Sequence, residues 1–555
     1  MIARRTADDP PAWAQSMVLL LALAMVWHSL DNHGLYPPDE ARYAAVSGWM
    51  AEHGNWLEPR LGDQLHITKP PLTYWAQALS QRMLGHKELA VRMPSALASS
   101  LLLIVTFRFA RRAFGAMPAM LAVGVLSAMP LFEVVGRLAI TDPLLAAWWW
   151  GALCCAWMAV EDGTSPVRRG WVAGFWACCA MVGLTKGPLV LAPPVIVAAW
   201  LALAGRLRDA RAFVPWIGLP LSIAPLALVA WGYWSANPAR AESVWRFEFV
   251  ERFTGGAHDD PRWLVPAAFM MGLFPATAMM TLPVFNVSWA RAWGAVRAGD
   301  LRALLVAAVV LPLAGFTLLR GSSPTYVLPM AAPLAVLVGL MLARWVGRRA
   351  ADVPAGERLP DVRITTGIVM TAIGIGVPTA AATVILRGVA PAWAGGWTLF
   401  WLSLCVVPAM VAAWIAMAWW GRPSLRLPAL GACFVGSACI WLGAWRAEDV
   451  AMSAMSPGIA ARALAERDGP TMVFGLPNAS VDWYLGRWVD AGRLEQDLAA
   501  WLAAHAEGTV LTDEWHLERL PAIDPASAAR LRPVAHLDGW PMKRLVLCEV
   551  LPPAK

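Results

Sequence analysis

Charged residues are scarce in this chain. Aspartate, glutamate, lysine and arginine together make up 15% of the 555 residues, whereas 58% of the residues are hydrophobic. Soluble globular chains carry about 25% charged residues, and the mean hydropathy here is +0.52. The composition excludes a soluble protein and indicates an integral membrane protein.

Three other features are missing. The formal charge of +7 is not gathered into a basic tract. Arginines lie mostly in short clusters between apolar runs, so no nucleic-acid partner is expected. The eight cysteines show no CxxC spacing, so neither a metal centre nor a disulfide framework is indicated. No small-residue cleavage site follows the first apolar stretch, which predicts a retained first helix.

Apolar runs long enough to cross a bilayer are abundant. A spanning helix needs about 20 largely apolar residues, and this length predicts a multi-span α-helical protein with about thirteen transmembrane helices. They lie near residues 15–31, 91–110, 114–133, 143–160, 171–185, 187–205, 213–233, 263–285, 303–319, 325–343, 364–386, 396–419 and 427–446. With a cytoplasmic N-terminus, the arginine clusters fall in the loops on the cytoplasmic side, which is the positive-inside pattern.

The stretches on the opposite, external side are polar. Residues 31–89 form a long loop, and its segments 39–54 and 71–85 have the helical periodicity of helices lying in the membrane interface. From residue 448 the composition becomes that of a soluble domain. Strands are predicted at 471–476, 508–513 and 543–550, and helices near 457–467, 480–486 and 493–505. The chain should therefore divide into a transmembrane domain, residues 1–447, and a small external α/β domain, residues 448–555.

Ionisable residues near the predicted membrane boundary define a candidate site. Such residues cost about 2.5 to 3.5 kcal/mol each at a helix centre, so those that do not serve orientation are expected to be functional. On the external side they come from six separate stretches: Asp39, Lys69, Asp142, Lys186, Arg252 and Tyr326. Cations beside carboxylates suit transfer from a phosphate-linked donor, because the cations hold the leaving phosphate while a carboxylate orients or deprotonates the acceptor.

Each of these residues also has a structural alternative. Either aspartate could cap a helix, either lysine could extend to lipid headgroups, and the tyrosine could belong to the aromatic belt at the membrane surface. The arginine could pair with Glu248 or Glu251, and Glu40 could be only a first-turn charge. His66 and His258 are candidate metal ligands, but no clear third ligand accompanies them. No cofactor is therefore expected to be required.

Several motifs together resemble a known family. They are YPPDEARYA (36–44), GNWLEPRL (54–61), TKPPLTYW (68–75), LGHKELAVRMPS (84–95), RLAITDPLL (137–145), LTKGPL (184–189) and YVLPMAAPLAVL (326–337). Over about the first 340 residues, the chain resembles the ArnT and protein O-mannosyltransferase group of GT-C glycosyltransferases, and the ArnT branch most. The resemblance implies a bacterial inner-membrane enzyme with a periplasmic active site and a periplasmic C-terminal domain.

The resemblance also implies the substrates. The donor would be a sugar on undecaprenyl phosphate, transferred with inversion, and the acceptor would be lipid A or another envelope glycan, with membrane lipids around the enzyme. ArnT itself transfers 4-amino-4-deoxy-arabinose to lipid A. Two alternatives stay open: transfer to protein hydroxyls, as in O-mannosylation, and a secondary transporter, which should show inverted repeats.

The resemblance also implies roles for individual residues. Asp39 and Asp142 match catalytic carboxylates. The residues expected to bind the donor phosphate or sugar are Lys69, Arg252, Tyr326, Lys186, Glu40, Tyr43, Tyr74 and His258. Two departures from ArnT stand out: Thr68 occupies a position that is often acidic, and the lysine often found near the YxLP run is absent from residues 320–329.

Overall fold

The computed structural model describes most of the chain. The described residues are 10–36, 38–62, 64–160, 168–246, 261–281, 294, 301–319, 322–347, 426–454, 457–476, 478–540 and 543–553. The spans expected near 364–386 and 396–419, together with Arg252 and His258, lie outside these residues.

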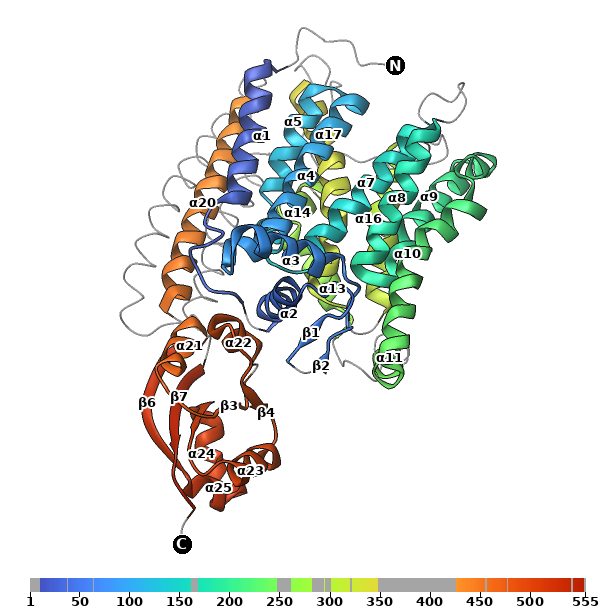
Figure 1. Ribbon diagram of the computed structural model, residues 1–555. Helices are drawn as coiled ribbons and strands as arrows, with labels where there is room; N and C mark the ends of the chain where they lie inside the picture. Colours follow the sequence, from blue (N-terminus) through green and yellow to red (C-terminus); the bar gives the residue numbers. More distant parts are fainter. Residues whose placement is uncertain are drawn as a thin grey trace.

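A bundle of apolar helices forms the first part of the molecule (Figure 1). Within the described residues, six helical stretches are long and apolar enough to cross a membrane. They are α4 (Glu88–Phe114), α7 (Asp142–Val160), α8 with η1 and α9 (Arg169–Lys186, Gly187–Leu191 and Ala192–Leu203), α10 (Pro215–Ala236), α16 (Leu301–Leu318), and η5 with α17 (Pro324–Met330 and Ala331–Gly347). The helical membrane architecture expected from the sequence is confirmed.

The first part of the molecule contains further described helices. They are α1 (Ala12–Trp27), α5 (Ala116–Ser127), α6 (Pro130–Val135), α11 (Pro238–Trp245), α13 (Leu264–Gly272), α14 (Ala276–Thr281) and the long α20 (Arg426–Ala454). The expected span 114–133 is thus divided between α5 and α6. Pro130 begins α6, and proline lacks the N–H needed to continue the preceding helix. The expected spans 171–185 and 187–205 correspond to α8 and α9, which follow each other through the 3-10 turn η1; the α-helical backbone is interrupted at Gly187, where φ is 57° and ψ is −111°.

Close helix packing depends on small residues. A Cβ added to Gly339 of α17 would lie 2.7 Å from both the Pro118 oxygen and the Ala122 nitrogen of α5. Such backbone contact is possible only for glycine, and it is a common way for membrane helices to associate.

The loop after α1 folds across one end of the bundle (Figure 1). It contains α2 (Asp39–His53), the short strands β1 (Arg60–Leu61) and β2 (Gln64–Leu65), and α3 (Leu72–Leu84). Gly54 ends α2 with φ of 69°, a left-handed conformation that favours glycine at this position. On α3, the side chains of Leu79 and Met83 are 53% and 70% exposed. Two helices in this loop confirm the expectation, and the exposed apolar face of α3 is typical of a helix at a membrane interface.

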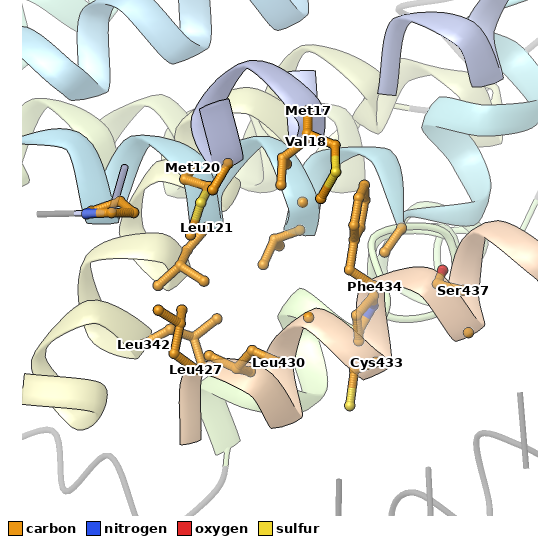
Figure 2. A pocket seen from close by; sticks show the side chains of 18 of the residues that line it. Met17, Val18, Met120, Leu121, Leu342, Leu427, Leu430, Cys433, Phe434 and Ser437 are labelled. Atoms are coloured by element: carbon orange, nitrogen blue, oxygen red, sulfur yellow. The ribbon is translucent and has the colours of Figure 1, made fainter. Parts of the chain in front are cut away.

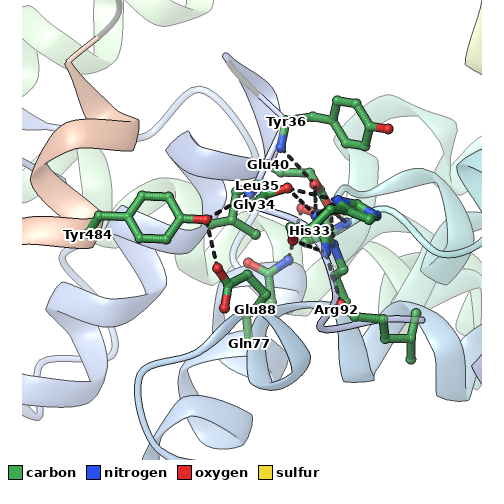
Figure 3. Close-up of polar contacts among 11 residues, drawn as sticks. His33, Gly34, Leu35, Tyr36, Glu40, Gln77, Glu88, Arg92 and Tyr484 are labelled. Atoms are coloured by element: carbon green, nitrogen blue, oxygen red, sulfur yellow. Dashed lines mark hydrogen bonds and ion pairs between the residues drawn. The ribbon is translucent and has the colours of Figure 1, made fainter. Parts of the chain in front are cut away.

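A buried ion pair holds this loop to the bundle (Figure 3). The Glu40 side chain in α2 is 1% exposed and the Arg92 side chain in α4 is 2% exposed, with Nη2 and Oε2 2.7 Å apart. Arg92 Nε also donates to Glu40 Oε1 at 3.0 Å. The remaining lone pairs of Glu40 accept hydrogen bonds from the backbone N–H groups of Tyr36 (3.0 Å) and Ala139 (2.7 Å). The guanidinium further donates to the carbonyl groups of Leu30, His33 and Gly34.

The C-terminal part is an α/β domain. Its sheet has the strand order β4-β3-β5-β7-β6, in which β3 (Thr471–Phe474), β4 (Asp490–Gly492) and β5 (Thr509–Asp513) are parallel, and β7 (Lys543–Val550) is antiparallel to both β5 and β6 (Leu531–Trp540). The helices are α21 (Pro457–Ala465), α22 (Ala479–Leu485), α23 (Glu495–Ala504), α24 (Glu514–Ile523) and α25 (Pro525–Ala529). The three expected strands are present. The sequence prediction missed β4 and β6, and α20 extends past the expected domain boundary at residue 447 to Ala454.

An apolar cavity of about 420 Å³ lies among α1, α5, α17 and α20 (Figure 2). Its lining includes Met17, Met120, Leu342, Leu430 and Phe434. Among the described residues, no charged side chain lines it, so the cavity lacks the groups needed to hold a phosphate.

Replacing Glu40 tests the structural importance of the buried pair. Glu40→Ala leaves the Arg92 guanidinium buried without its carboxylate, so the free energy of unfolding should fall by about 3 to 5 kcal/mol. Chemical denaturation of the purified protein in detergent measures this change. Glu58→Ala is the matched control, because Glu58 pairs with Arg60 at a site where both side chains are 38% exposed. The control should lose less than about 1 kcal/mol; equal losses in the two variants would contradict the structural role of Glu40.

Asp482 should make the stability of the C-terminal domain depend on pH. Its side chain accepts from Asn478 Nδ2 (2.8 Å) and from the backbone N–H of Val489 (3.0 Å), and burial raises its pKa from 3.8 to about 7. The folded domain therefore binds this proton more tightly than the unfolded chain does. The resulting stabilisation is complete below about pH 4 and is lost as the pH rises through about 7.

Thermal unfolding of the full-length protein between pH 5 and pH 8 measures this dependence. The wild type should lose stability relative to Asp482→Asn as the pH rises. A wild-type-minus-variant difference that is constant across this range would show that Asp482 does not titrate there.

Candidate active site

The two carboxylates predicted to be catalytic occupy different environments. Asp39 is the first residue of α2; its side chain is 58% exposed and pairs with Arg42 one turn later. Asp142 is the first residue of α7, and its side chain is 6% exposed. Both sit at helix N-termini, where a negative charge is favoured. Asp39 is therefore open to a reactant, whereas Asp142 is enclosed by the protein.

Asp142, Lys186 and Tyr326 meet as a trio. Lys186 Nζ lies 2.9 Å from Asp142 Oδ1 and 3.8 Å from the centroid of the Tyr326 ring. The lysine comes from the end of α8 and the tyrosine from η5, and the Lys186 side chain is only 10% exposed. The ammonium is held by a carboxylate and an aromatic face, which is a cation–π contact, and does not extend toward lipid headgroups.

Two tyrosines link the trio to α2. Tyr43 of α2 and Tyr74 of α3 are stacked, with ring centroids 5.2 Å apart, and both are buried. Burial raises the pKa of Tyr43 well above its usual range, and the nearby charges of Asp142 and Asp39 add to this effect while Arg42 opposes it. The neighbouring Tyr74 also raises the pKa of Tyr43, so this phenol stays protonated.

A basic cluster surrounds His66, between β2 and α3. Burial lowers the pKa of His66 to about 3, and the positive charges of Arg42, Arg240 and Lys69 lower it further. The ring is neutral at physiological pH, and the three cations lie near enough to act on its charge. Arg240 reaches this cluster from α11 and donates through Nε to the Leu65 carbonyl at 3.3 Å.

The basic cluster adjoins the trio. The turn 68–71 carries Lys69, and the turn 185–188 carries Lys186. Gly187 has φ of 57°, and a Cβ added there would lie 3.9 Å from Pro70 Cγ. The two lysine-bearing turns therefore touch, although they lie more than a hundred residues apart in the sequence.

Glu40 and Thr68 both lie close to the candidate site, and both have partners within the protein. Glu40 was expected to bind substrate, but it is buried and its oxygens accept hydrogen bonds from Arg92, Tyr36 and Ala139; it is a structural residue. Thr68 contacts the ring of His66, with Oγ1 3.0 Å from Nε2. In the part of the chain that the structure describes, no group of three or more histidine, cysteine, aspartate or glutamate side chains could hold a metal ion.

Sequence reasoning missed Arg240. The external stretch 235–263 contains several arginines; the resemblance to the family points to Arg252, in an Arg-Phe pair, and Arg246 is a rival phosphate contact. The available signal was that Arg240 belongs to the first helical turn after Asn237-Pro238, a start that caps α11 and fixes its direction.

The fold is that of a GT-C membrane glycosyltransferase. ArnT from Cupriavidus metallidurans matches 96% of this chain and 97% of its own, with TM-scores of 0.76 in the apo state and 0.75 bound to undecaprenyl phosphate, at 19% identity. The Archaeoglobus fulgidus oligosaccharyltransferase in the apo form matches 92% of this chain and 70% of its own, with a TM-score of 0.51 and 12% identity.

Sequence comparisons agree with the fold. The model of the family described as dolichyl-phosphate-mannose-protein mannosyltransferase matches residues 68–234. An undecaprenyl phosphate-α-4-amino-4-deoxy-L-arabinose arabinosyl transferase of Pseudomonas fluorescens (strain Pf0-1) is 31% identical over 60% of this chain and 60% of its own length. A second, from Enterobacter sp. (strain 638), is 30% identical over 58% of each. The chain is thus ArnT-like in sequence and in fold, and the alignments span less than two thirds of these relatives.

Coupling between Asp142 and Lys186 can be measured with a double-mutant cycle. Asp142→Asn, Lys186→Met and the double variant should show a coupling energy of about 1 to 3 kcal/mol in the free energy of unfolding, because each single change leaves one charge buried alone. Arg206 and Asp209, 2.7 Å apart but about one third exposed, give the control cycle, with an expected coupling below about 1 kcal/mol. A coupling energy of zero between Asp142 and Lys186 would show that the two charges do not stabilise each other.

Proposed function

We propose that this protein is a glycosyltransferase that moves a 4-amino-4-deoxy-L-arabinose-type sugar from undecaprenyl phosphate to lipid A, with inversion. The observation that carries the proposal is the exposed Asp39 beside the basic cluster of Arg42, Lys69 and Arg240. The relatives named above are arabinosyl transferases with that lipid-linked sugar in their names, and the resemblance in the motifs supplies the acceptor.

The positions of the cations and of Asp39 suggest how the sugar is transferred. The cations around His66 hold the donor phosphate, chiefly Lys69 and Arg240, while the acceptor oxygen approaches the anomeric carbon from the Asp39 side. The bond from that carbon to the acceptor oxygen forms as its bond to the phosphate oxygen breaks, and the phosphate leaves with the bonding electrons as an anion stabilised by the cations. A displacement from the opposite face inverts the anomeric carbon.

Asp39 has a role that depends on the acceptor. A hydroxyl acceptor gives its proton to the Asp39 carboxylate, which then acts as a general base. A phosphate acceptor is already anionic, and Asp39 then orients it through Arg42. Because protein cations neutralise the leaving phosphate, no metal cofactor belongs to this proposal.

The proposed location is the bacterial inner membrane, with the site and the C-terminal domain in the periplasm. Support comes from the arginines at the opposite end of the bundle. α4 runs from Glu88, beside α3, to Arg111 and Arg112, and α20 runs from Arg426 toward the C-terminal domain. Basic residues at the far ends of these helices are typical of the cytoplasmic side.

Transfer to protein hydroxyls is the second candidate. It is favoured by the description of the family model that matches residues 68–234. A secondary transporter is disfavoured, because transporters bind substrate near the membrane midplane and the polar clusters here gather at the end of the bundle that carries α2 and α3.

Mass spectrometry of lipid A and of envelope proteins, with and without this protein, tests the proposal. The protein should add the mass of an aminopentose to lipid A. A modification confined to envelope proteins would favour the second candidate, and an unchanged envelope would contradict both.

Two variants assign the roles in a sugar-transfer assay with the purified protein and its lipid-linked donor. Asp39→Asn should lower kcat at least about a hundredfold, and Lys69→Ala should mainly raise the KM for the lipid-linked donor. Glu52→Gln and Lys87→Ala, which alter exposed charges on the same loop and its exit, are the matched controls and should retain activity. Full transfer by Asp39→Asn would eliminate its catalytic role, and an unaltered donor KM in Lys69→Ala would eliminate the phosphate contact.

A further inference from the structure

The C-terminal domain is fastened to the loop that carries Asp39. The hydroxyl of Tyr484, in α22, accepts a hydrogen bond from the backbone N–H of Leu35 at 3.0 Å and donates to Glu88 Oε1 at 2.8 Å. Figure 3 shows this hydroxyl between the two partners. One side chain of the C-terminal domain thus bridges the segment before α2 and the first residue of α4.

The neighbouring residue strengthens the junction. The Trp483 indole stacks on the His86 imidazole with centroids 4.3 Å apart. Its Nε1 donates to Gln81 Oε1 at 3.2 Å, and its carbonyl lies 2.6 Å from His86 Nε2. Trp483 is 3% exposed and packs in a buried cluster with small apolar residues of α2, including Ala41 and Ala44. The contact combines a buried apolar cluster, an aromatic stack and directed hydrogen bonds, which distinguishes it from two domains that merely touch.

The junction continues into the candidate site. Tyr36 follows Leu35, and its backbone N–H donates to Glu40. Glu40 is adjacent to Asp39 and also accepts from the Ala139 N–H, three residues before Asp142. The segment held by Tyr484 therefore leads directly into the start of α2, where Asp39 lies, and Glu40 connects that start to the stretch before Asp142.

We propose that the C-terminal domain is a positioning element of the active site, acting through Tyr484 and Trp483 on residues 35–40. Neither side chain touches a reacting atom; both set where α2 begins and therefore where Asp39 points. The catalytic meaning of this inference rests on the proposed function, whereas the fastening of the segment does not.

The test uses the full-length protein and two measurements. Tyr484→Phe keeps the ring but removes both hydrogen bonds. We expect faster hydrogen exchange of the Leu35 amide and its neighbours, together with a fall in kcat of about tenfold at an unchanged donor KM, because small displacements of a catalytic group lower rate rather than binding. Trp501→Phe is the matched control: it removes an indole hydrogen bond to Asp490 inside the same domain and should alter neither measurement in this way.

The two measurements test separate parts of the proposal. Unchanged exchange at Leu35 would overturn the fastening, and faster exchange with full kcat would overturn the positioning role. If Tyr484→Phe does not fold, His86→Phe takes its place, because it keeps the aromatic stack but removes the hydrogen bond to the Trp483 carbonyl. A wild-type protein that transfers no sugar would contradict the proposed function, while the exchange measurement would still decide whether the domain holds the segment.

Discussion

The buried ion pair between Glu40 and Arg92 is the constraint on which the arrangement of this protein depends. Neither charge is accessible to water, and removing one partner of such a pair is far more destabilising than separating an exposed pair. The pair brings together four stretches of chain: the segment after α1, the start of α2, the first turns of α4, and the residues before α7. Backbone N–H and carbonyl groups of these stretches, at the expected membrane boundary, are thereby hydrogen-bonded to the two side chains.

This constraint helps explain how the two aspartates predicted to be catalytic, far apart in the sequence, come to have different environments. Asp39 follows directly from the fixed end of α2 and stays exposed, so its charge is available to an incoming acceptor. Asp142 is neutralised by Lys186, which in turn rests on the Tyr326 ring. Arg42, Arg240 and Lys69 act on the charge of His66, whereas the described residues that line the apolar cavity among α1, α5, α17 and α20 carry no charge.

Much of this architecture could be predicted because it depends on local properties of the sequence. The length of the apolar runs predicted a helical membrane protein, and six of the described helical stretches are long and apolar enough to cross a membrane. The three predicted strands are present, and Asp142, Lys186 and Tyr326, which were predicted to lie on one face, are in contact. The role of Glu40 could not be predicted, since a glutamate in a first helical turn is ordinarily a solvated charge. Its partner Arg92 lies on another helix, and only tertiary packing decides which charge is buried. The same holds for Arg240, whose approach to His66 depends on the direction of α11, and for the edge strands β4 and β6, which pair only once the sheet exists.

The most direct test of the account is the position of undecaprenyl phosphate bound to this protein in a cryo-electron microscopy map. The account predicts that the phosphate lies within hydrogen-bonding distance of Lys69, on the side of α2 that exposes Asp39 and next to the turn of Lys186. A phosphate bound elsewhere, such as in the half of the bundle that contains the apolar cavity, would contradict it.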